Sequence, residues 1–181
     1  MPYSQRRLPQ LSAIGQPLFV TFRLHGSLPP GREFPKESMT SGKAFVYMDR
    51  LLDHHRAGPM YLAMPSIAQL VANSIEGGSL SDYLLHAWVI MPNHVHLLIT
   101  PQEDVAKLMQ KLKGTTAREA NQMFSRAGVP FWQHESYDHL VRNADEYWRI
   151  ADYIVQNPVQ AGLAASAEEY RWSGGLKPAA S

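Results

Sequence analysis

The chain has 181 residues, 45% hydrophobic and 18% charged, a size that favours a single domain with one sizeable core. Its 17 lysines and arginines nearly balance its 16 aspartates and glutamates, so any surface that binds a polyanion must be local. Because it has no cysteine and no run of about 20 apolar residues, disulfides, thiolate metal sites and membrane spans are excluded, and a cytoplasmic protein is expected.

The first half of the chain predicts one strand followed by two helices. Residues 17–25 alternate apolar and polar side chains with the period of a strand. Residues 26–36 contain three prolines and two glycines and are predicted to form a loop. Apolar residues then recur at helical spacing in 43–56 and 66–75, so the segment 31–79 is expected to be mainly helical.

The middle of the chain predicts a β-hairpin. Residues 83–90 and 94–100 are rich in β-branched and aromatic side chains, and only Met91, Pro92 and Asn93 separate them. A connection of this length with turn-forming residues is typical of two adjacent antiparallel strands.

A helix, a strand and a second helix are predicted to follow. Residues 105–124 present one apolar helical face, and 136–141 have strand character. Asn143 is placed to cap a helix that is predicted to end near Asn157, because the residue before a proline disfavours helical dihedrals. The C-terminal tail 164–181 shows no clear period, and no element is assigned to it.

Two histidines form a candidate metal pair. His94 and His96 occupy alternate positions of the predicted strand 94–100, so both imidazoles project from one face. Two neutral imidazoles make half of a metal site, and further ligands must come from the rest of the chain or from substrate oxygens. The alternative, two histidines on a half-exposed strand, stays open on this pattern alone.

The final predicted helix carries a candidate nucleophile. Tyr153 and Asn157 lie four residues apart and share a helical face. A tyrosine hydroxyl, with its pKa near ~10, needs a metal that polarises a phosphate or a nearby base to attack it. The amide oxygen of Asn157 would complete the metal shell. The alternative is that Tyr153 packs in the core and Asn157 caps the end of the helix before Pro158. The spacing of the two residues does not distinguish these interpretations.

Other residues are assigned secondary roles. Tyr147 precedes Tyr153 by six positions and lies roughly opposite it around the helix axis. Tyr147 and Tyr137 are therefore predicted to be structural. Asp138 and Arg142 are predicted to support the site, either as an ion pair or by positioning DNA.

Basic residues follow the polar face of the predicted helix 105–124. A solvated face is the usual explanation for such a stripe, but this helix directly follows the strand that carries the histidine pair, and cations that contact phosphates set the register of bound DNA. We predict DNA contacts by Lys107, Lys111, Lys113 and Arg118. Phe131 and Trp132 are candidates for stacking on unpaired bases, whereas Trp88 is expected in the core.

The run HAWVIMPNHVHLLI at 86–99 resembles the signature of the HUH single-tyrosine transposases, particularly the REP-associated tyrosine transposases. The similarity extends from about Arg6 to Ser173 and is weakest in 31–79. Further similar segments occur in the family's order at 112–114, 120–121, 131–133, 137–142, 153–159, 161–163 and 170–173.

The resemblance implies an α+β fold over 1–181, the HUH endonuclease fold. Its ferredoxin-like or RRM-like antiparallel sheet has helices packed on one face and the metal site on the other. In the family, the residue that Tyr153 matches attacks single-stranded DNA, forms a 5′-phosphotyrosine and frees a 3′-hydroxyl. By position, His94 and His96 match the paired ligands. Asn157 matches the polar helix residue that joins them, which is often glutamine in the family.

The resemblance also implies partners. It implies Mg²⁺ or Mn²⁺ as the cofactor, single-stranded DNA with a hairpin or inverted repeat as the substrate, and a monomer or homodimer. Arg6 and Arg7 would form a basic arm near the DNA. One alternative is a domesticated protein that binds hairpins without cutting, which would need no aligned tyrosine and histidine pair. An RNA-binding module would instead display paired aromatic residues on central strands, and none are seen.

Overall fold

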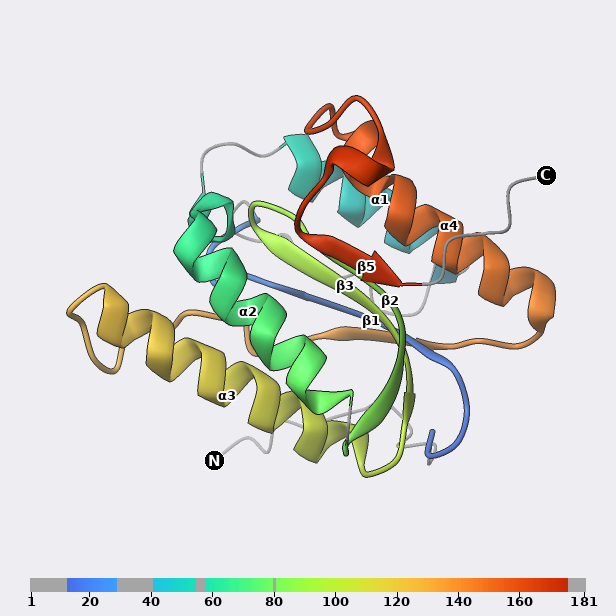
Figure 1. Ribbon diagram of the computed structural model, residues 1–181, viewed down its shortest axis with the longest axis horizontal. Coiled ribbons are helices and arrows are strands. Elements are labelled where there is room, and N and C mark those ends of the chain that lie inside the picture. The colour runs from blue at the N-terminus through green and yellow to red at the C-terminus, as the bar shows by residue number, and fades with distance from the viewer. Residues whose placement is uncertain (1–12, 29–40, 55–57, 80, 176–181) are drawn as a thin grey trace, which may run out of the picture.

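A five-stranded antiparallel sheet organises the molecule. The structure, a computed structural model, describes residues 13–28, 41–54, 58–79 and 81–175. The strands follow the order β4-β1-β3-β2-β5 across the sheet, with helices packed around it (Figure 1). The predicted α+β class is confirmed.

The elements have the following bounds. The strands are β1 (Leu18–Arg23), β2 (Tyr83–Ile90), β3 (His94–Pro101), β4 (Tyr137–Leu140) and β5 (Ser173–Gly175). The helices are α1 (Ser41–His54), α2 (Pro65–Gly78), α3 (Val105–Met123) and α4 (Ala144–Gln160), with short 3₁₀ turns η1 (Tyr61–Ala63) and η2 (Ala167–Glu169). None of the described helices is both long enough and apolar enough to cross a bilayer.

Helix α4 runs one turn beyond its predicted end. Asn157 was expected to terminate it, yet the helix passes through Pro158 to Gln160. A proline at this position removes the hydrogen bond that its own N–H would give to the carbonyl one turn earlier, and its ring crowds that carbonyl. The Ala161 N–H donates to the Asn157 carbonyl and closes the last turn, so the helix continues despite the proline.

Strand β5 was not predicted, because it has no strand-forming residues. It is built from Ser173, Gly174 and Gly175, and it pairs with β2 at the edge of the sheet. A Cβ atom on Gly174 would lie 2.6 Å from the Trp88 indole nitrogen. Gly175 has φ of +131° and lies against the backbone of β2. The close approach of two backbones therefore requires glycine here.

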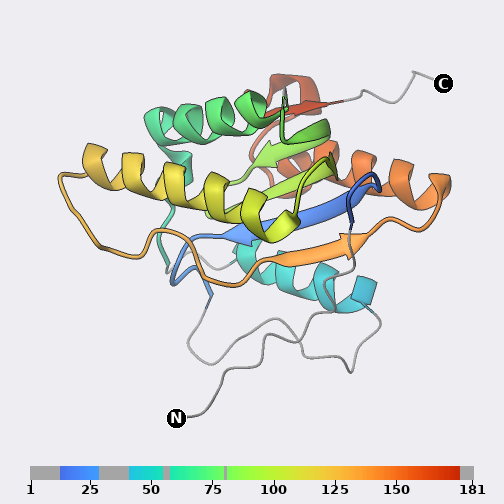
Figure 2. The same ribbon diagram turned by 90° about the horizontal axis from the view of Figure 1, so that it is seen from below.

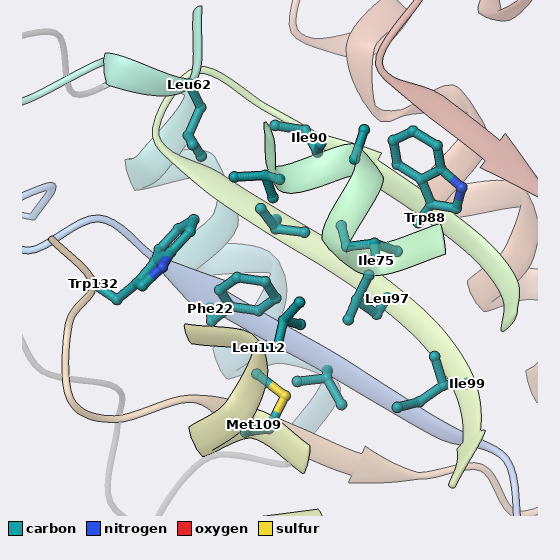
Figure 3. Close-up of a cluster of buried hydrophobic side chains, with 14 of the residues drawn as sticks. Phe22, Leu62, Ile75, Trp88, Ile90, Leu97, Ile99, Met109, Leu112 and Trp132 are labelled. Atoms are coloured by element: carbon teal, nitrogen blue, oxygen red, sulfur yellow. The ribbon is translucent and has the colours of Figure 1, made fainter. Parts of the chain in front are cut away.

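One face of the sheet carries the larger core. Alternate residues of β1 and β3, including Val20, Phe22, Leu97 and Ile99, point to this face and are fully buried under α2 and α3 (Figures 2 and 3). Burying a side chain of this size stabilises the fold by roughly 1.5–3 kcal/mol.

Three aromatic residues considered above lie in the same core: Trp88, Phe131 and Trp132. All three are buried. The core position expected for Trp88 is confirmed, and the base-stacking role suggested for Phe131 and Trp132 is wrong, because neither ring is available to a base.

The other face of the sheet also carries helices. Here α4 buries Ala151 and Ile154 against a smaller apolar cluster that includes Phe19, Val89 and Leu98. Figure 2 shows α1 on the side of the sheet away from α2 and α3. The helices therefore form a layer on each face, and the prediction that they pack on one face only is wrong. The residues that carry chemistry lie under α1 and α4.

Candidate active site

The histidine pair lies at the centre of the sheet. In β3, His94 is paired with Arg23 of β1, and His96 is paired with Thr21. Strand β2 flanks β3 on its other side, so β3 has neighbours along both edges. Both imidazoles are fully buried, and their ring centroids lie 4.7 Å apart.

A carboxylate from α1 joins the pair. Asp49 Oδ1 lies 3.1 Å from His94 Nε2 and 3.0 Å from His96 Nε2. Asp49 is buried and is 47 positions from His96 in the sequence. Asp49 was not predicted from the sequence. Its available signal was an aspartate on the same helical face as Leu52, where an apolar residue is expected.

An amide from α4 completes the cluster. Asn157 Nδ2 donates to Asp49 Oδ2 at 3.1 Å, and the side chain is buried. Its Oδ1 atom is buried and has no hydrogen-bond partner among the residues that the structure describes. Leaving a buried acceptor unsatisfied costs about 1–3 kcal/mol, and a bound cation beside Asn157 would remove that cost.

The electrostatics of the cluster favour an ionised carboxylate. Burial alone would raise the pKa of Asp49, but the charges and hydrogen bonds of His96 and His94 hold that pKa well below its usual range. Asp53 lies one helical turn further along α1. Burial, opposed by His94 and assisted by the charge of Asp49, raises the pKa of Asp53 to about 6.

This group of residues fits a divalent metal ion. One ligand atom from each of Asp49, His94 and His96 lies within 4.8 Å of the others. A carboxylate oxygen only accepts hydrogen bonds, so its short approaches to two imidazole nitrogens require protons or a cation between them. Imidazole, carboxylate and amide ligands together suit Mn²⁺ and other first-row divalent ions, and the oxygen ligands also suit Mg²⁺.

Tyr153 lies on the same face as this cluster. Its ring centroid is 5.7 Å from that of His96 and 6.4 Å from that of Phe19, which it meets edge-on. The side chain is half-buried, within the smaller apolar cluster. Helix α4 thus presents a phenol and, one turn later, the amide of Asn157 to the histidine-bearing strand.

Tyr147 and Tyr137, the other two tyrosines considered from the sequence, pack against other aromatic rings. Tyr147 packs edge-on against His86 of β2, with ring centroids 5.4 Å apart. Tyr137 of β4 packs edge-on against Phe19 at 6.4 Å. Both rings also contact the smaller apolar cluster, which is consistent with packing roles.

Comparison with known proteins identifies relatives over the segment that carries these residues. Residues 76–157 match a family described as "Transposase IS200 like", a range that includes the tyrosine, both histidines and the asparagine but not Asp49. The chain is 30% identical over 91 residues to the REP-associated tyrosine transposase of Escherichia coli (strain K12), covering 49% of this chain and 52% of that protein.

A second relative and a solved structure are also similar to this chain. A putative REP-associated tyrosine transposase of Haemophilus influenzae is 27% identical over 97 residues, covering 46% of this chain and 54% of that protein. The chain thus spans about half the length of these relatives. A solved REP-associated tyrosine transposase bound to a REP hairpin has a TM-score of 0.59 and 19% identity, covering 96% of this chain and 82% of that one. That likeness shows the fold.

The predicted resemblance to the REP-associated tyrosine transposases is confirmed. Within this transposase-like fold, the basic stripe belongs to α3, on the face opposite the histidines. Lys107 and Arg118 are exposed. Lys111 is also exposed but forms an ion pair with Asp82 at 2.6 Å.

Lys113 differs from the rest of the stripe. It is half-buried, and its ammonium group donates to the backbone carbonyls of Gln133 and His134 and to the Ser136 hydroxyl. Burial, with a contribution from the charge of Arg23, lowers the pKa of Lys113 to about 8. Lys113 therefore holds the segment before β4, and its predicted DNA contact remains a prediction.

The predicted supporting residues are separated from the metal cluster. Asp138 pairs with Val20 in the β1–β4 register, which places it on the face of the sheet opposite the histidines. The backbone N–H of Arg142 donates to Glu146, and in the described ranges no ion pair joins Arg142 to Asp138. Arg6 and Arg7, the predicted basic arm, lie outside the described residues.

Proposed function

We propose that this chain is a metal-dependent single-stranded DNA endonuclease and strand transferase that acts beside hairpin-forming repeats. One observation carries the proposal. A single helix, α4, brings the phenol of Tyr153 beside His96 and the amide of Asn157 against Asp49. A candidate nucleophile and a candidate divalent-ion site therefore share one face of the sheet.

In the proposed reaction, the phenolic oxygen of Tyr153 attacks a backbone phosphorus atom. The bond from that phosphorus to the 3′ oxygen of the upstream nucleotide breaks. The products are a 5′-phosphotyrosine and a 3′-hydroxyl, and the proton lost by the phenol balances the proton gained by the released oxygen. One phosphate ester replaces another, so attack by a 3′-hydroxyl can reverse the step and join strands.

The metal would be held by four side chains: Asp49, His94, His96 and Asn157. Bound there, Mg²⁺ or Mn²⁺ would supply Lewis-acid polarisation of a phosphate oxygen. The carboxylate and the amide come from two different helices. All four side chains are buried, so their ligand atoms are shielded from bulk water.

We propose a hairpin-bearing DNA strand as the partner. A protein of the same fold is described as bound to a REP hairpin. In this chain the exposed cations Lys107 and Arg118 lie on α3, across the sheet from Tyr153. The hairpin stem would therefore contact a different side of the molecule from the strand that is cut.

A covalent-adduct assay tests the chemistry. The full chain, with Mn²⁺, is incubated with a hairpin-bearing single strand labelled at its 3′ end. The labelled portion should become attached to the protein and migrate with it in a denaturing gel, whereas a 5′ label should be released. Tyr153→Phe should abolish the adduct, while the matched variant Tyr147→Phe, on the same helix, should retain it.

Three outcomes would redirect the proposal. An adduct that persists in Tyr153→Phe would place the nucleophile elsewhere. Hairpin binding without an adduct, in every divalent metal tried, would favour a domesticated protein that recognises hairpins without cutting them. Cleavage of an ordinary duplex would indicate a general metal nuclease.

A further inference from the structure

Asn93 lies between the two elements that carry candidate metal ligands. It immediately precedes His94 and is 3% exposed. Its Nδ2 atom donates to the Leu52 carbonyl of α1 at 2.9 Å, and its Oδ1 atom lies 2.7 Å from His94 Nδ1. One side chain thus connects β3 to the helix that bears Asp49.

These two contacts determine where His94 carries its proton. The Leu52 carbonyl can only accept, so the NH₂ end of the Asn93 amide must face it. The oxygen end then faces His94, and because that oxygen also only accepts, Nδ1 of His94 must be the donor. In the neutral ring the lone pair is therefore on Nε2, the atom that lies 3.1 Å from Asp49 Oδ1.

His96 has a neighbour of a different kind. Its Nδ1 lies 2.7 Å from Thr21 Oγ1. A hydroxyl both donates and accepts, so Thr21 holds the ring in place without selecting the position of the proton. Of the two groups that face the Nδ1 atoms, only the Asn93 amide selects a tautomer.

We propose that Asn93 is a positioning residue that fixes the Nδ1–H tautomer of His94 and fastens β3 to α1, so that His94 Nε2 and the Asp49 carboxylate face one divalent ion. This inference rests on the proposed metal site. It adds a residue that contacts no substrate or metal and acts through the orientation of a ligand, as hydrogen-bonded neighbours of metal-binding histidines do.

The affinity of the DNA-free protein for Mn²⁺ tests the inference, measured by isothermal titration calorimetry on the full chain. Asn93→Ala should weaken Mn²⁺ binding by about 10–100-fold, the usual effect of losing such a neighbour. Asn121→Ala is the matched control. Asn121 is also buried, and its amide donates to the Val129 carbonyl and accepts from Arg126 Nε. It lies on α3, across the sheet from the histidines. It should leave the affinity unchanged.

A second measurement does not depend on the variant folding. Nitrogen-15 NMR of the histidine rings in the Mg²⁺-loaded wild-type protein should show His94 protonated at Nδ1 and unprotonated at Nε2. A proton on Nε2 of His94 would overturn the inference. So would equal Mn²⁺ affinities for Asn93→Ala and Asn121→Ala. If the wild-type protein binds no divalent ion at all, the proposed metal site itself has failed, which is a separate result.

Discussion

Asp49 changes the charge of the candidate site. In their neutral, metal-binding form the two imidazoles and the amide would carry no net charge, whereas the ionised carboxylate adds one negative charge that a divalent cation can neutralise. The three groups already face one another in the protein alone. We therefore expect an ion to bind before DNA arrives, and DNA oxygens to fill the remaining positions.

Replacing this carboxylate should weaken metal binding more than replacing its neighbour. Asp49→Asn keeps the size of the side chain and removes its charge, so Mn²⁺ affinity should fall by at least the ~10–100-fold that loss of a supporting group causes. Asp53→Asn, one turn along the same helix, contributes no atom to the ligand group and should change the affinity far less. Calorimetry without DNA measures both.

An equal loss in the two variants would show that the helix supplies only general negative charge. In that case, His94, His96 and Asn157 would remain the protein ligands, as the sequence alone suggested.

At the level of single residues, the sequence predicted the candidates that lie in local patterns. His94 and His96 stand two positions apart on a strand, and Tyr153 and Asn157 stand four apart on a helix, so periodicity alone places each pair on a face. Asp49 comes from a helix whose position over the sheet depends on the whole fold. No local spacing relates it to the histidines, and it lies in the segment least similar to the family.

Strand β5 consists of residues that do not favour strands, so its own sequence does not predict it. Periodicity and β-propensity both fail to predict it, because glycine is unfavourable in strands. Its formation depends on the adjacent β2 backbone and on Trp88, neither of which is visible in the sequence near Ser173. The other four strands and the four helices were predicted because their apolar periods stand out, whereas the 3₁₀ turns η1 and η2 were not.

Substitution of one β5 glycine should detach this strand. In Gly175→Ala, the new Cβ would meet the backbone of His86 and Ala87 at a φ of +131°, so we expect a loss of stability of at least ~1–3 kcal/mol. Gly77→Ala is the matched control, since it lies in α2 with nothing near the added atom. It should stabilise the helix by roughly 0.5–1 kcal/mol.

Thermal unfolding followed by circular dichroism measures both glycine variants. An unchanged Tm in Gly175→Ala would show that β5 contributes nothing to the fold.

Helix α3 offers a graded test of DNA contact. Each cation that contacts a phosphate steepens the dependence of hairpin affinity on salt, by about one unit in the logarithmic slope. Lys107→Gln and Arg118→Gln should each reduce that slope. Lys111→Gln should reduce it less, because Asp82 already neutralises this ammonium group. Fluorescence anisotropy with a labelled hairpin at several salt concentrations gives the slopes. Equal slopes for the three variants and the wild-type protein would show that α3 does not contact DNA.

For the molecule as a whole, Lys113 should make stability depend on pH. Burial, opposed by the charge of Glu135 and assisted by the charge of Arg23, lowers the pKa of Lys113 from 10.5 to about 8. Between these values the unfolded chain holds a proton that the folded protein has lost, so the free energy of unfolding should rise with pH. The limiting slope for one proton is about 1.4 kcal/mol per pH unit, and partial exposure of the side chain will reduce it.

Comparison of the wild-type protein with Lys113→Met isolates this effect. Urea unfolding between about pH 8 and pH 10 should show a smaller rise with pH in the variant. Above that range the raised pKa of Tyr170, about 12 because the phenol is buried, opposes the trend, since the unfolded chain then loses its phenolic proton first. A rise of equal size in both proteins would exclude Lys113 as its source.

The larger core lies across the sheet from the candidate catalytic groups. Phe22, Leu97 and their neighbours under α2 and α3 hold the fold together, whereas Tyr153 sits in a smaller cluster on the reverse side. Loss of the candidate catalytic groups therefore need not unfold the protein. A gene copy that loses the phenol by mutation would still encode a well-folded protein with its α3 surface intact. If that surface contacts DNA as predicted, a single substitution would separate DNA binding from cleavage.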